Sequence, residues 1–520
     1  MTNGIASNDE SLQIPIQDKS PRIVAGLNRP MKTKPLGEQS LAVRRQGLMV
    51  ILGNVGLLTA GMALGLPTVT LPQLTNPEEK VHLTISQASW FASINALACP
   101  LGGVLSGFVL DRIGRKCSLF LLNVLGLIAW SLMALATQDD SDVVYIQLLV
   151  SRFIIGIATG LCTAPVGVYS AEICLPKIRG RMILGTSISV ALGITVIYIL
   201  GYFIRGDWHL IASICCGYQL IAFLCVIPMP ESPSWLVSKG RLEEAKKSLN
   251  YFRGQEKSSE IVNAEVAAEF SLLKKSIQLG VGEKKQSFLQ QLRLPEVYKP
   301  LLILMGLFAF QQLTGIFVVI AYAVQIATEA GVSIDPFMCA ILVGMSRLFT
   351  TFPMGFILER WGRRRAGLIS AFGMSICMFL LAGHSWMQWL HDIPYLPVAA
   401  ILSFIVLSTL GLYTLPFFMI SELFPQKVRG PAAGLTVAVG MFISFLTLKT
   451  YPAMKLAIGG EFCFVVYGSI AFVGMLFIYL VLPETRGRTL LEIEERFRSG
   501  KSEKSRKPVE VEMQEVFIKR

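Results

Sequence analysis

Charge is what this sequence has little of. Of its 520 residues only 16% are Asp, Glu, Lys or Arg, whereas 53% are hydrophobic. A typical soluble domain carries about 25% charged residues. The mean hydropathy of +0.56 shows that apolar side chains have taken the place of the missing charge. This composition excludes an ordinary soluble protein and indicates that lipid is the solvent around much of the chain.

Other absences narrow the class of function. No Asn-x-Ser/Thr sequence occurs, so N-glycosylation is not expected. The ten cysteines lie in or beside apolar stretches, which argues against a disulfide framework. No nucleophile–base pair or metal-ligand cluster stands out, so we expect no enzyme, no catalytic residue, no cofactor and no metal. The four histidines are all expected at the outer ends of helices: His82, His209, His384 and His391.

Long stretches without charge determine the predicted fold class. A helix needs about 20 apolar residues to cross the hydrocarbon core, and backbone groups cannot stay unpaired in lipid. The sequence therefore predicts an all-α membrane protein with twelve transmembrane helices in two sets of six. The eighth reaches full length only by including Arg347. The stretches are 46–66, 86–110, 117–138, 153–171, 182–204, 210–230, 300–328, 337–358, 366–390, 393–421, 431–448 and 462–483.

The polar segments predict the domain organisation. We expect an N-terminal tail (1–45), a first six-helix bundle (46–230), a linker (231–298), a second bundle (299–483) and a C-terminal tail (484–520). Apolar residues recur at helical spacing in SKGRLEEAKKSLNYFRG, so the linker is expected to form short helices on the cytoplasmic membrane face. A loose linker is the alternative.

Basic residues predict the orientation. With both termini in the cytoplasm, the outer loops hold only Lys80, Arg205 and Lys455. The short inner loops are rich in Lys and Arg, as the positive-inside rule requires. The net charge of +12 is then mostly topology, and a nucleic-acid partner is not expected. The inner-loop residues are Arg112, Arg115, Lys116, Lys177, Arg179, Arg181, Arg360, Arg363, Arg364, Arg365, Lys427 and Arg429.

The two halves repeat three motifs in the same order and at nearly constant offset. GFVLDRIGRK at 107–116 corresponds to GFILERWGRR at 355–364. Glu172, followed by Arg179-Gly180, corresponds to Glu422, followed by Arg429-Gly430, and PES at 230–232 corresponds to PET at 483–485. The repeat indicates duplication of a six-helix unit, an arrangement in which transporters bind substrate between the repeats near the midplane.

The repeated loops predict a cytoplasmic gate. Their glycines permit tight turns, and their acids and arginines can pair with Glu172 and Arg179, or with Glu422 and Arg429, on neighbouring helix ends. We expect such pairs to clamp the two halves together; the alternative is that the bases only set topology. The candidate gate residues are Asp111, Arg112, Arg115, Glu172, Arg179, Glu359, Arg360, Arg363, Glu422 and Arg429.

Several motifs resemble the signatures of the sugar-porter family of the major facilitator superfamily. They are GFVLDRIGRK, SRFIIGIATG, VYSAEICLPKIRGR, PESPSWL, QQLTGI, ELFPQKVRG and PETRGRTL, in the family's order over about residues 45–497. Within that family the chain looks most like the insect facilitated trehalose transporters. The resemblance implies the major facilitator fold, in which two six-helix bundles rock around one central site.

The resemblance also implies a substrate site built by spans five, seven, ten and eleven. The paired glutamines of span seven are present, and their amides can both donate to and accept from sugar hydroxyls, although they could instead bond neighbouring helices. Several other positions depart from the family's polar residues. Together with a charged midplane residue, the candidate substrate-binding residues are Gln311, Gln312, Ser187, Phe317, Tyr322, Phe417, Ser444 and Arg347.

Two arginines lie inside the predicted spans. Proton-coupled members of the family pair an arginine at the position of Arg152 with an aspartate in span one, but residues 46–66 hold no carboxylate. This favours passive uniport. Arg347 lies twelve residues before Glu359, so about 18 Å along the helix and near the midplane. It could be satisfied by carbonyls of a broken neighbouring helix, or could contact an anionic or strongly polar substrate.

The leading prediction is facilitated diffusion of a sugar, hexose or trehalose-like, by alternating access. The solute would be a small molecule, the surrounding partner membrane lipid, and the location the plasma membrane. One alternative is a transporter of a non-sugar polyol or organic anion. Another is a non-transporting nutrient sensor built on the same fold.

Overall fold

The computed structural model describes residues 36–137, 140–162, 164–255, 266–275, 288–387, 393–425, 428–488 and 490–499. Within them, twelve helical segments are long and apolar enough to cross a membrane, which confirms the predicted count. The predicted tail segments 1–35 and 500–520 lie outside the described residues. Helix α2 begins at Leu36, so residues 36–45 of the predicted N-terminal tail are helical.

The first six spans are formed by α2 (Leu36–Leu74), α3 (Ile85–Ile113), α4 (Arg115–Ala134), α5 (Ser141–Leu161) with α6 (Pro165–Ile173), α7 (Pro176–Phe203) and α8 (Trp208–Val226). The last six are formed by α13 (Pro295–Leu313) with α14 (Ile316–Ala321), α16 (Pro336–Trp361), α17 (Arg363–Trp386), α19 (Leu396–Leu410) with α20 (Leu415–Leu423), α21 (Arg429–Ile458) and α22 (Gly460–Val481). A short helix, α15 (Ala323–Glu329), continues from α14, and α23 (Leu490–Ser499) follows the last span.

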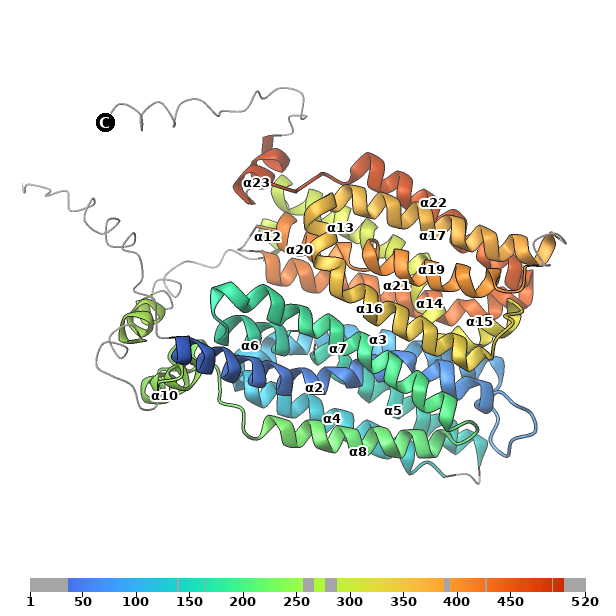
Figure 1. The fold of residues 1–520 in the computed structure, drawn as a ribbon, viewed down its shortest axis with the longest axis horizontal. Helices are drawn as coiled ribbons and strands as arrows, with labels where there is room; N and C mark the ends of the chain where they lie inside the picture. Colours follow the sequence, from blue (N-terminus) through green and yellow to red (C-terminus); the bar gives the residue numbers. More distant parts are fainter. Residues whose placement is uncertain are drawn as a thin grey trace, which may run out of the picture.

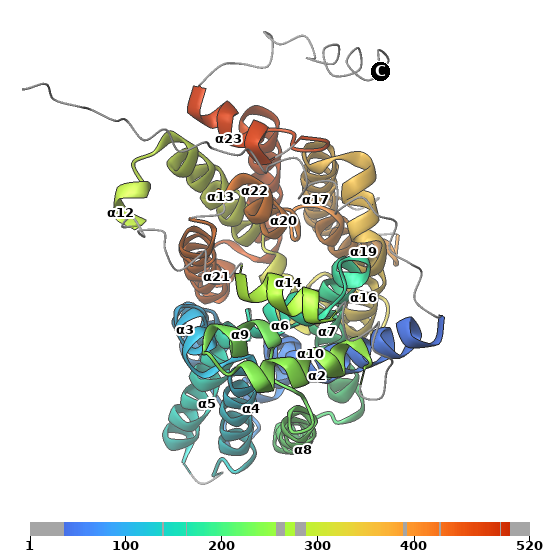
Figure 2. The same cartoon turned by 90° about the vertical axis from the view of Figure 1, so that its left-hand side faces the viewer.

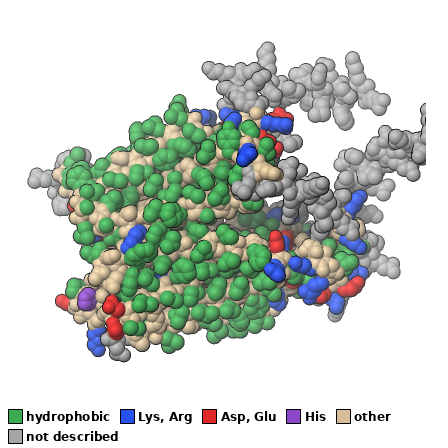
Figure 3. Space-filling model, turned by 180° about the vertical axis from the view of Figure 1, so that it is seen from behind, with side chains coloured by type: hydrophobic (Ala, Val, Ile, Leu, Met, Phe, Trp, Pro, Cys, Tyr) green, Lys and Arg blue, Asp and Glu red, His purple; other side chains and the backbone are tan. Residues whose placement is uncertain are grey.

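The spans gather into two halves that lie against each other (Figures 1 and 2). In the first half α2 packs on α7, α3 on α5 and α4 on α8; in the second α17 packs on α19 and α22, and α13 on α21. The halves meet where α3 contacts α21 and α7 contacts α16. Figure 3 shows hydrophobic side chains covering the flank of the bundle, as lipid requires, with charge gathered towards its two ends.

Small residues let the helices of the first half approach closely. A Cβ on Gly61 of α2 would collide with the Val190 carbonyl of α7, and one on Gly193 would collide with the Leu58 carbonyl. Gly102 of α3 meets the backbone of α5 in the same way. In lipid, helix association depends on such close packing because hydrophobic burial between helices is not a driving force.

Two spans of the second half are interrupted. The seventh breaks between Leu313 and Ile316, where Gly315 takes a φ of +79°, a left-handed conformation that glycine adopts without strain. The sequence alone predicts a bend here, because a glycine follows the paired glutamines, and the structure confirms it. The tenth breaks over residues 411–414 between α19 and α20. Broken helices expose backbone groups at the level of the membrane interior, where transporters of this general type bind substrate.

The linker forms short helices, as its spacing predicted. They are α9 (Pro233–Ser238), α10 (Leu242–Arg253), a helical segment at 266–275 and α12 (Phe288–Gln291). Helix α10 lies beyond one end of the bundle (Figure 1), and the Trp235 indole of α9 donates to the Asp111 carbonyl near the end of α3 at 3.1 Å. We call this end of the bundle the linker end. The opposite end carries the loop 75–84, Arg205 and Asp335.

Candidate functional site

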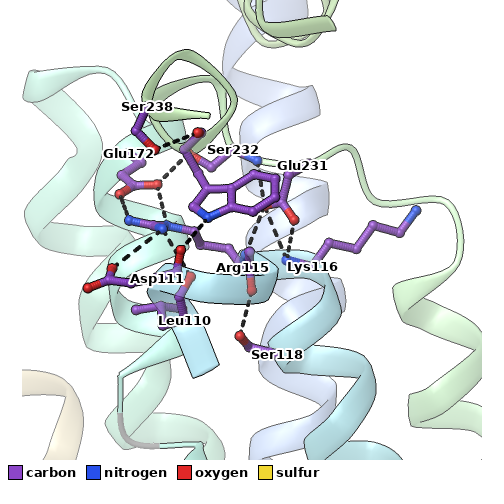
Figure 4. A network of polar contacts seen from close by, with 11 residues as sticks. Leu110, Asp111, Arg115, Lys116, Ser118, Glu172, Glu231, Ser232 and Ser238 are labelled. Atoms are coloured by element: carbon purple, nitrogen blue, oxygen red, sulfur yellow. Dashed lines mark hydrogen bonds and ion pairs between the residues drawn. The ribbon is translucent and has the colours of Figure 1, made fainter. Parts of the chain in front are cut away.

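A part-buried ion pair joins two helices at the linker end of the first half (Figure 4). The Arg115 guanidinium, at the start of α4, donates to both carboxylate oxygens of Glu172 on α6, at 2.7 and 3.0 Å. The two side chains are only 11% and 18% exposed. Asp111 lies 4.0 Å from Arg115 but is 85% exposed. The bidentate geometry and burial make Arg115–Glu172 the strong member of this group.

The PES motif completes the same network. The carboxylate of Glu231 accepts the backbone N–H of Arg115 at 2.9 Å and that of Lys116 at 3.1 Å, and the Ser232 hydroxyl donates to Glu172. Burial raises the pKa of Glu231, and the backbone N–H groups of Ser232, Lys116 and Arg115 oppose that rise. Gly114, with a φ of +100°, leaves the room that this carboxylate fills, because a Cβ there would collide with Oε2 of Glu231. The carboxylate thus caps the first turn of α4.

The second half repeats this network residue by residue. Arg363 donates to Glu422 at 2.6 Å, and its backbone N–H donates to Glu484 of the PET motif at 3.1 Å. The Thr485 hydroxyl donates to Glu422 at 2.5 Å. A Cβ on Gly362, whose φ is +87°, would lie 2.8 Å from Oε2 of Glu484. The structure therefore adds Glu231 and Glu484 to the candidate gate, and the matching PES and PET positions were the sequence signal for them.

The remaining candidate gate residues take different places. Arg112 lies exposed over the Phe108 ring, and Arg360 lies exposed over the Phe356 ring. Asp111, Glu359 and Arg179 are also exposed, and Arg429 donates to the Phe424 carbonyl at 3.1 Å.

Among the described residues, the candidate gate residues form no ion pair between the halves. Both part-buried ion pairs, Arg115–Glu172 and Arg363–Glu422, join helices of the same half. The physical reason is topological: the loop after the second or eighth span is followed by a helix that packs beside the fourth or tenth span of its own bundle. The prediction that arginine and glutamate pair here was sound, but the idea that they bridge the halves requires correction for this conformation.

Polar contacts between the halves occur instead towards the opposite end. The hydroxyls of Thr68 on α2 and Tyr198 on α7 both donate to the Ile320 carbonyl of α14, at 2.6 and 2.5 Å. Lys449 on α21 donates to Ser89 of α3 at 2.7 Å. Arg205 pairs with Asp335, the N-cap of α16. These contacts fasten the halves together at the end away from the linker.

Four of the candidate substrate-binding residues come together in the second half. Gln311, fully buried, donates to the Tyr413 carbonyl, and Gln312 donates to Oε1 of Gln311 at 3.0 Å. The Phe317 ring lies 5.9 Å from the Tyr413 ring, and the Arg347 guanidinium lies 4.1 Å above it. We call these five residues the central cluster. Tyr413 was missed from the sequence, where a single tyrosine in an apolar run is indistinguishable from a core aromatic.

The other candidates lie apart from these contacts. The Tyr322 hydroxyl donates to the Leu448 carbonyl at 3.3 Å, and Ser444 is 1% exposed on α21. Phe417 is 43% exposed and packs edge-on against Phe308, while Ser187 is exposed on α7. The structure therefore brings Gln311, Gln312, Phe317 and Arg347 together. Outside the central cluster lie Ser187, Tyr322, Phe417 and Ser444.

Comparison with known proteins supplies the family. The family model described as "Sugar (and other) transporter" matches residues 54–497. The "Facilitated trehalose transporter Tret1-2 homolog" of Drosophila simulans is 30% identical over 446 residues, which cover 85% of this chain and 88% of that protein. The "Facilitated trehalose transporter Tret1" of Aedes aegypti is 31% identical over 86% of this chain, but the chain spans only 55% of that relative's length.

Solved structures agree on the fold. The inward open conformation of the xylose transporter XylE from E. coli matches with a TM-score of 0.72 and 24% sequence identity, covering 86% of this chain and 98% of that one. At this identity the likeness establishes the architecture of two six-helix halves and carries no residue-level assignment.

Proposed function

The chain belongs to the sugar transporter family, and on that premise we propose that it moves a sugar, hexose or trehalose-like, by facilitated diffusion through alternating access. The observation that carries the proposal is the family match over residues 54–497, which spans both halves and the linker. The relatives named as facilitated trehalose transporters support the choice of a sugar.

The distribution of contacts between the halves supports alternating access. They are fastened towards the opposite end by Thr68, Tyr198 and Lys449, while the ion pairs of the linker end stay within each half. Such an arrangement suits a state open towards the linker end. We infer that the two linker-end networks keep the helix ends of each half rigid, so that each half moves as a unit.

The family and the distribution of basic residues also bear on the orientation of the protein and on the membrane that holds it. We propose that the linker end faces the cytoplasm, because it carries the basic loops that the positive-inside rule assigns to that side. A multi-pass protein with this composition and family would serve uptake at the plasma membrane.

The surroundings of Arg152 support uniport. Its guanidinium donates to the carbonyls of Ala63 on α2 and Phe91 on α3, at 2.5 and 3.1 Å. Helix α2 offers no carboxylate along 46–74, so this arginine has backbone partners where a proton-coupled transporter would need a titratable one. We infer that no proton is carried with the solute.

The test is uptake into proteoliposomes holding the purified full chain, with radiolabelled trehalose, glucose, fructose, polyols and small organic acids. We expect at least one sugar to enter and to reach the outside concentration without exceeding it. Accumulation that collapses with an uncoupler would refute uniport. A folded protein that moves none of the solutes would favour the sensor alternative.

A further inference from the structure

Arg152 and Arg347 are both buried inside apolar spans, and the structure satisfies them very differently. Arg152 is 1% exposed, and its guanidinium donates hydrogen bonds to backbone carbonyls of α2 and α3. A buried charge is tolerated when its donors are used in this way. Arg152 is therefore a structural arginine that joins three helices of the first half.

Arg347 is 3% exposed, but its N–H donors are unused. Among the described residues its guanidinium makes no hydrogen bond or ion pair, and it stacks on the face of the Tyr413 ring, 4.1 Å from the ring centroid. A stacked ring attracts the cation but accepts none of its N–H groups in the guanidinium plane. Each nitrogen of Arg347 keeps a small area that water can reach, so the unpaired donors are not sealed off by protein.

Arg347 lies on a helix at the interface between the two halves. It belongs to α16, the helix of the second half that packs on α7 of the first. One turn earlier on α16, a Cβ on Gly344 would lie 3.0 Å from Oγ1 of Thr195 and 3.1 Å from the Tyr198 ring, both on α7. Tyr413 connects Arg347 to Gln311, because its ring lies under the guanidinium and its backbone carbonyl accepts from the Gln311 amide.

The neighbourhood lacks a counter-charge. Every Asp and Glu of the twelve spans lies within about a turn of a span end, as Glu172, Glu359 and Glu422 do. A buried cation without a counter-ion is costly, and a bound anion would relieve that cost. The cluster also contains one unsatisfied hydrogen-bond acceptor. Oε1 of Gln312 is buried and has no donor among the described residues. A hydroxyl group of a ligand is the donor that this oxygen lacks.

Resting on the proposed transport of a sugar, we propose that the central cluster selects a sugar bearing a carboxylate, such as a uronate or an aldonate. The planar fork of Arg347 matches a carboxylate with two parallel hydrogen bonds, and Oε1 of Gln312 accepts from a hydroxyl of the same solute. A sugar phosphate fits less well, because it brings up to two charges to a cluster with one cation. Tyr413 holds the guanidinium in place from below.

The test compares radiolabelled glucuronate and glucose in proteoliposomes with the full chain. In the unmodified protein we expect glucuronate to enter, to compete with glucose, and to enter faster at an inside-positive membrane potential, since uniport of an anion carries charge. Arg347→Gln should lower the ratio of glucuronate to glucose uptake at least tenfold, and Arg347→Lys should lower it less. Lys449→Gln removes another span cation outside the cluster and should leave that ratio unchanged.

The outcomes separate the two proposals. If glucose enters but glucuronate neither enters nor competes, or if Arg347→Gln leaves the ratio unchanged, the carboxylate assignment is wrong and sugar transport stands. If neither these two solutes nor any other sugar enters through a folded, monodisperse protein, the proposed function itself fails, and the assignment fails with it.

Discussion

The backbone N–H of Arg115 donates to the carboxylate of Glu231 at 2.9 Å, so the first residue after the first bundle caps the helix of that bundle's third span. Glu484 makes the equivalent bond to Arg363 in the second half. Each carboxylate also lies close to the positive end of a helix dipole. The two halves therefore repeat the same hydrogen bond at the start of the same helix.

Replacing either capping carboxylate should loosen its own half. We expect Glu231→Ala and Glu484→Ala each to destabilise the protein by about 1 kcal/mol, the usual cost of a lost helix cap. Thermal unfolding of the detergent-solubilised protein measures the loss. The control is Glu243→Ala, which removes an exposed carboxylate of α10 and should leave the unfolding temperature unchanged. Equal behaviour of all three variants would contradict the capping role.

The arginine that matters at each repeated loop should be the second one. Arg115→Ala and Arg363→Ala each remove the two hydrogen bonds that the guanidinium donates to a part-buried glutamate, so we expect transport to fall at least tenfold with reduced stability. Arg112→Ala and Arg360→Ala remove exposed side chains and should have a much smaller effect. Initial uptake rates, normalised to protein in the vesicles, provide the comparison. Loss of transport in the Arg112 variant alone would restore a gating role to the first arginine.

These two networks show how far the sequence could be taken. Charge-free stretches predicted twelve spans because lipid forces length and apolarity on a helix, and Gly315 predicted a break because only glycine accepts its φ easily. The choice between Arg112 and Arg115 could not be made, since it depends on where α3 ends and how the turn at Gly114 redirects the chain. The role of Tyr413 was likewise hidden, because it arises from the turn at 411–414.

Acid should weaken the fastening at the opposite end. Burial by itself would raise the pKa of Asp335, but the Arg205 guanidinium and the Phe337 backbone N–H hold it below its ordinary value. The ion pair therefore contributes fully at neutral pH and is lost as the pH falls through that depressed pKa. Since the partners are 34% and 47% exposed, the contribution is modest, about 0.2–1 kcal/mol, and should shrink with added salt.

The acid effect can be measured at neutral pH with Asp335→Asn. The asparagine imitates the protonated aspartate. It can still cap α16, because its amide oxygen can accept from the Phe337 N–H as the native carboxylate does at 2.8 Å. We expect a cysteine introduced between the halves at the opposite end to react faster with a thiol reagent in Asp335→Asn than in the parent. The parent should approach that rate as the outside pH is lowered below about 4. Equal reactivity of the parent and Asp335→Asn at neutral pH would exclude the pair as a fastening.

The paired glutamines should fail in different ways. Gln311 uses its amide to hold the Tyr413 carbonyl, so Gln311→Ala frees the turn at 411–414 and displaces the ring beneath Arg347. Oε1 of Gln312 is buried and accepts no hydrogen bond from the described residues, so a ligand hydroxyl could supply the missing donor. We therefore expect Gln311→Ala to lower both the stability and the maximal uptake rate. Gln312→Ala should raise the apparent KM for the solute at least tenfold with normal stability.

Gln312→Glu sharpens the distinction between these roles. It keeps an acceptor oxygen in place but introduces a negative charge into the central cluster, where it would repel the carboxylate of a solute. For an acidic sugar we expect uptake to fall further than in Gln312→Ala, whereas a neutral sugar should tolerate the change better. Concentration-dependent uptake of both solutes into matched vesicles, with unfolding temperatures of the same preparations, separates binding from folding. If Gln311→Ala and Gln312→Ala shift KM and stability alike, the two amides act as one structural unit, and the central cluster is packing and not a binding site.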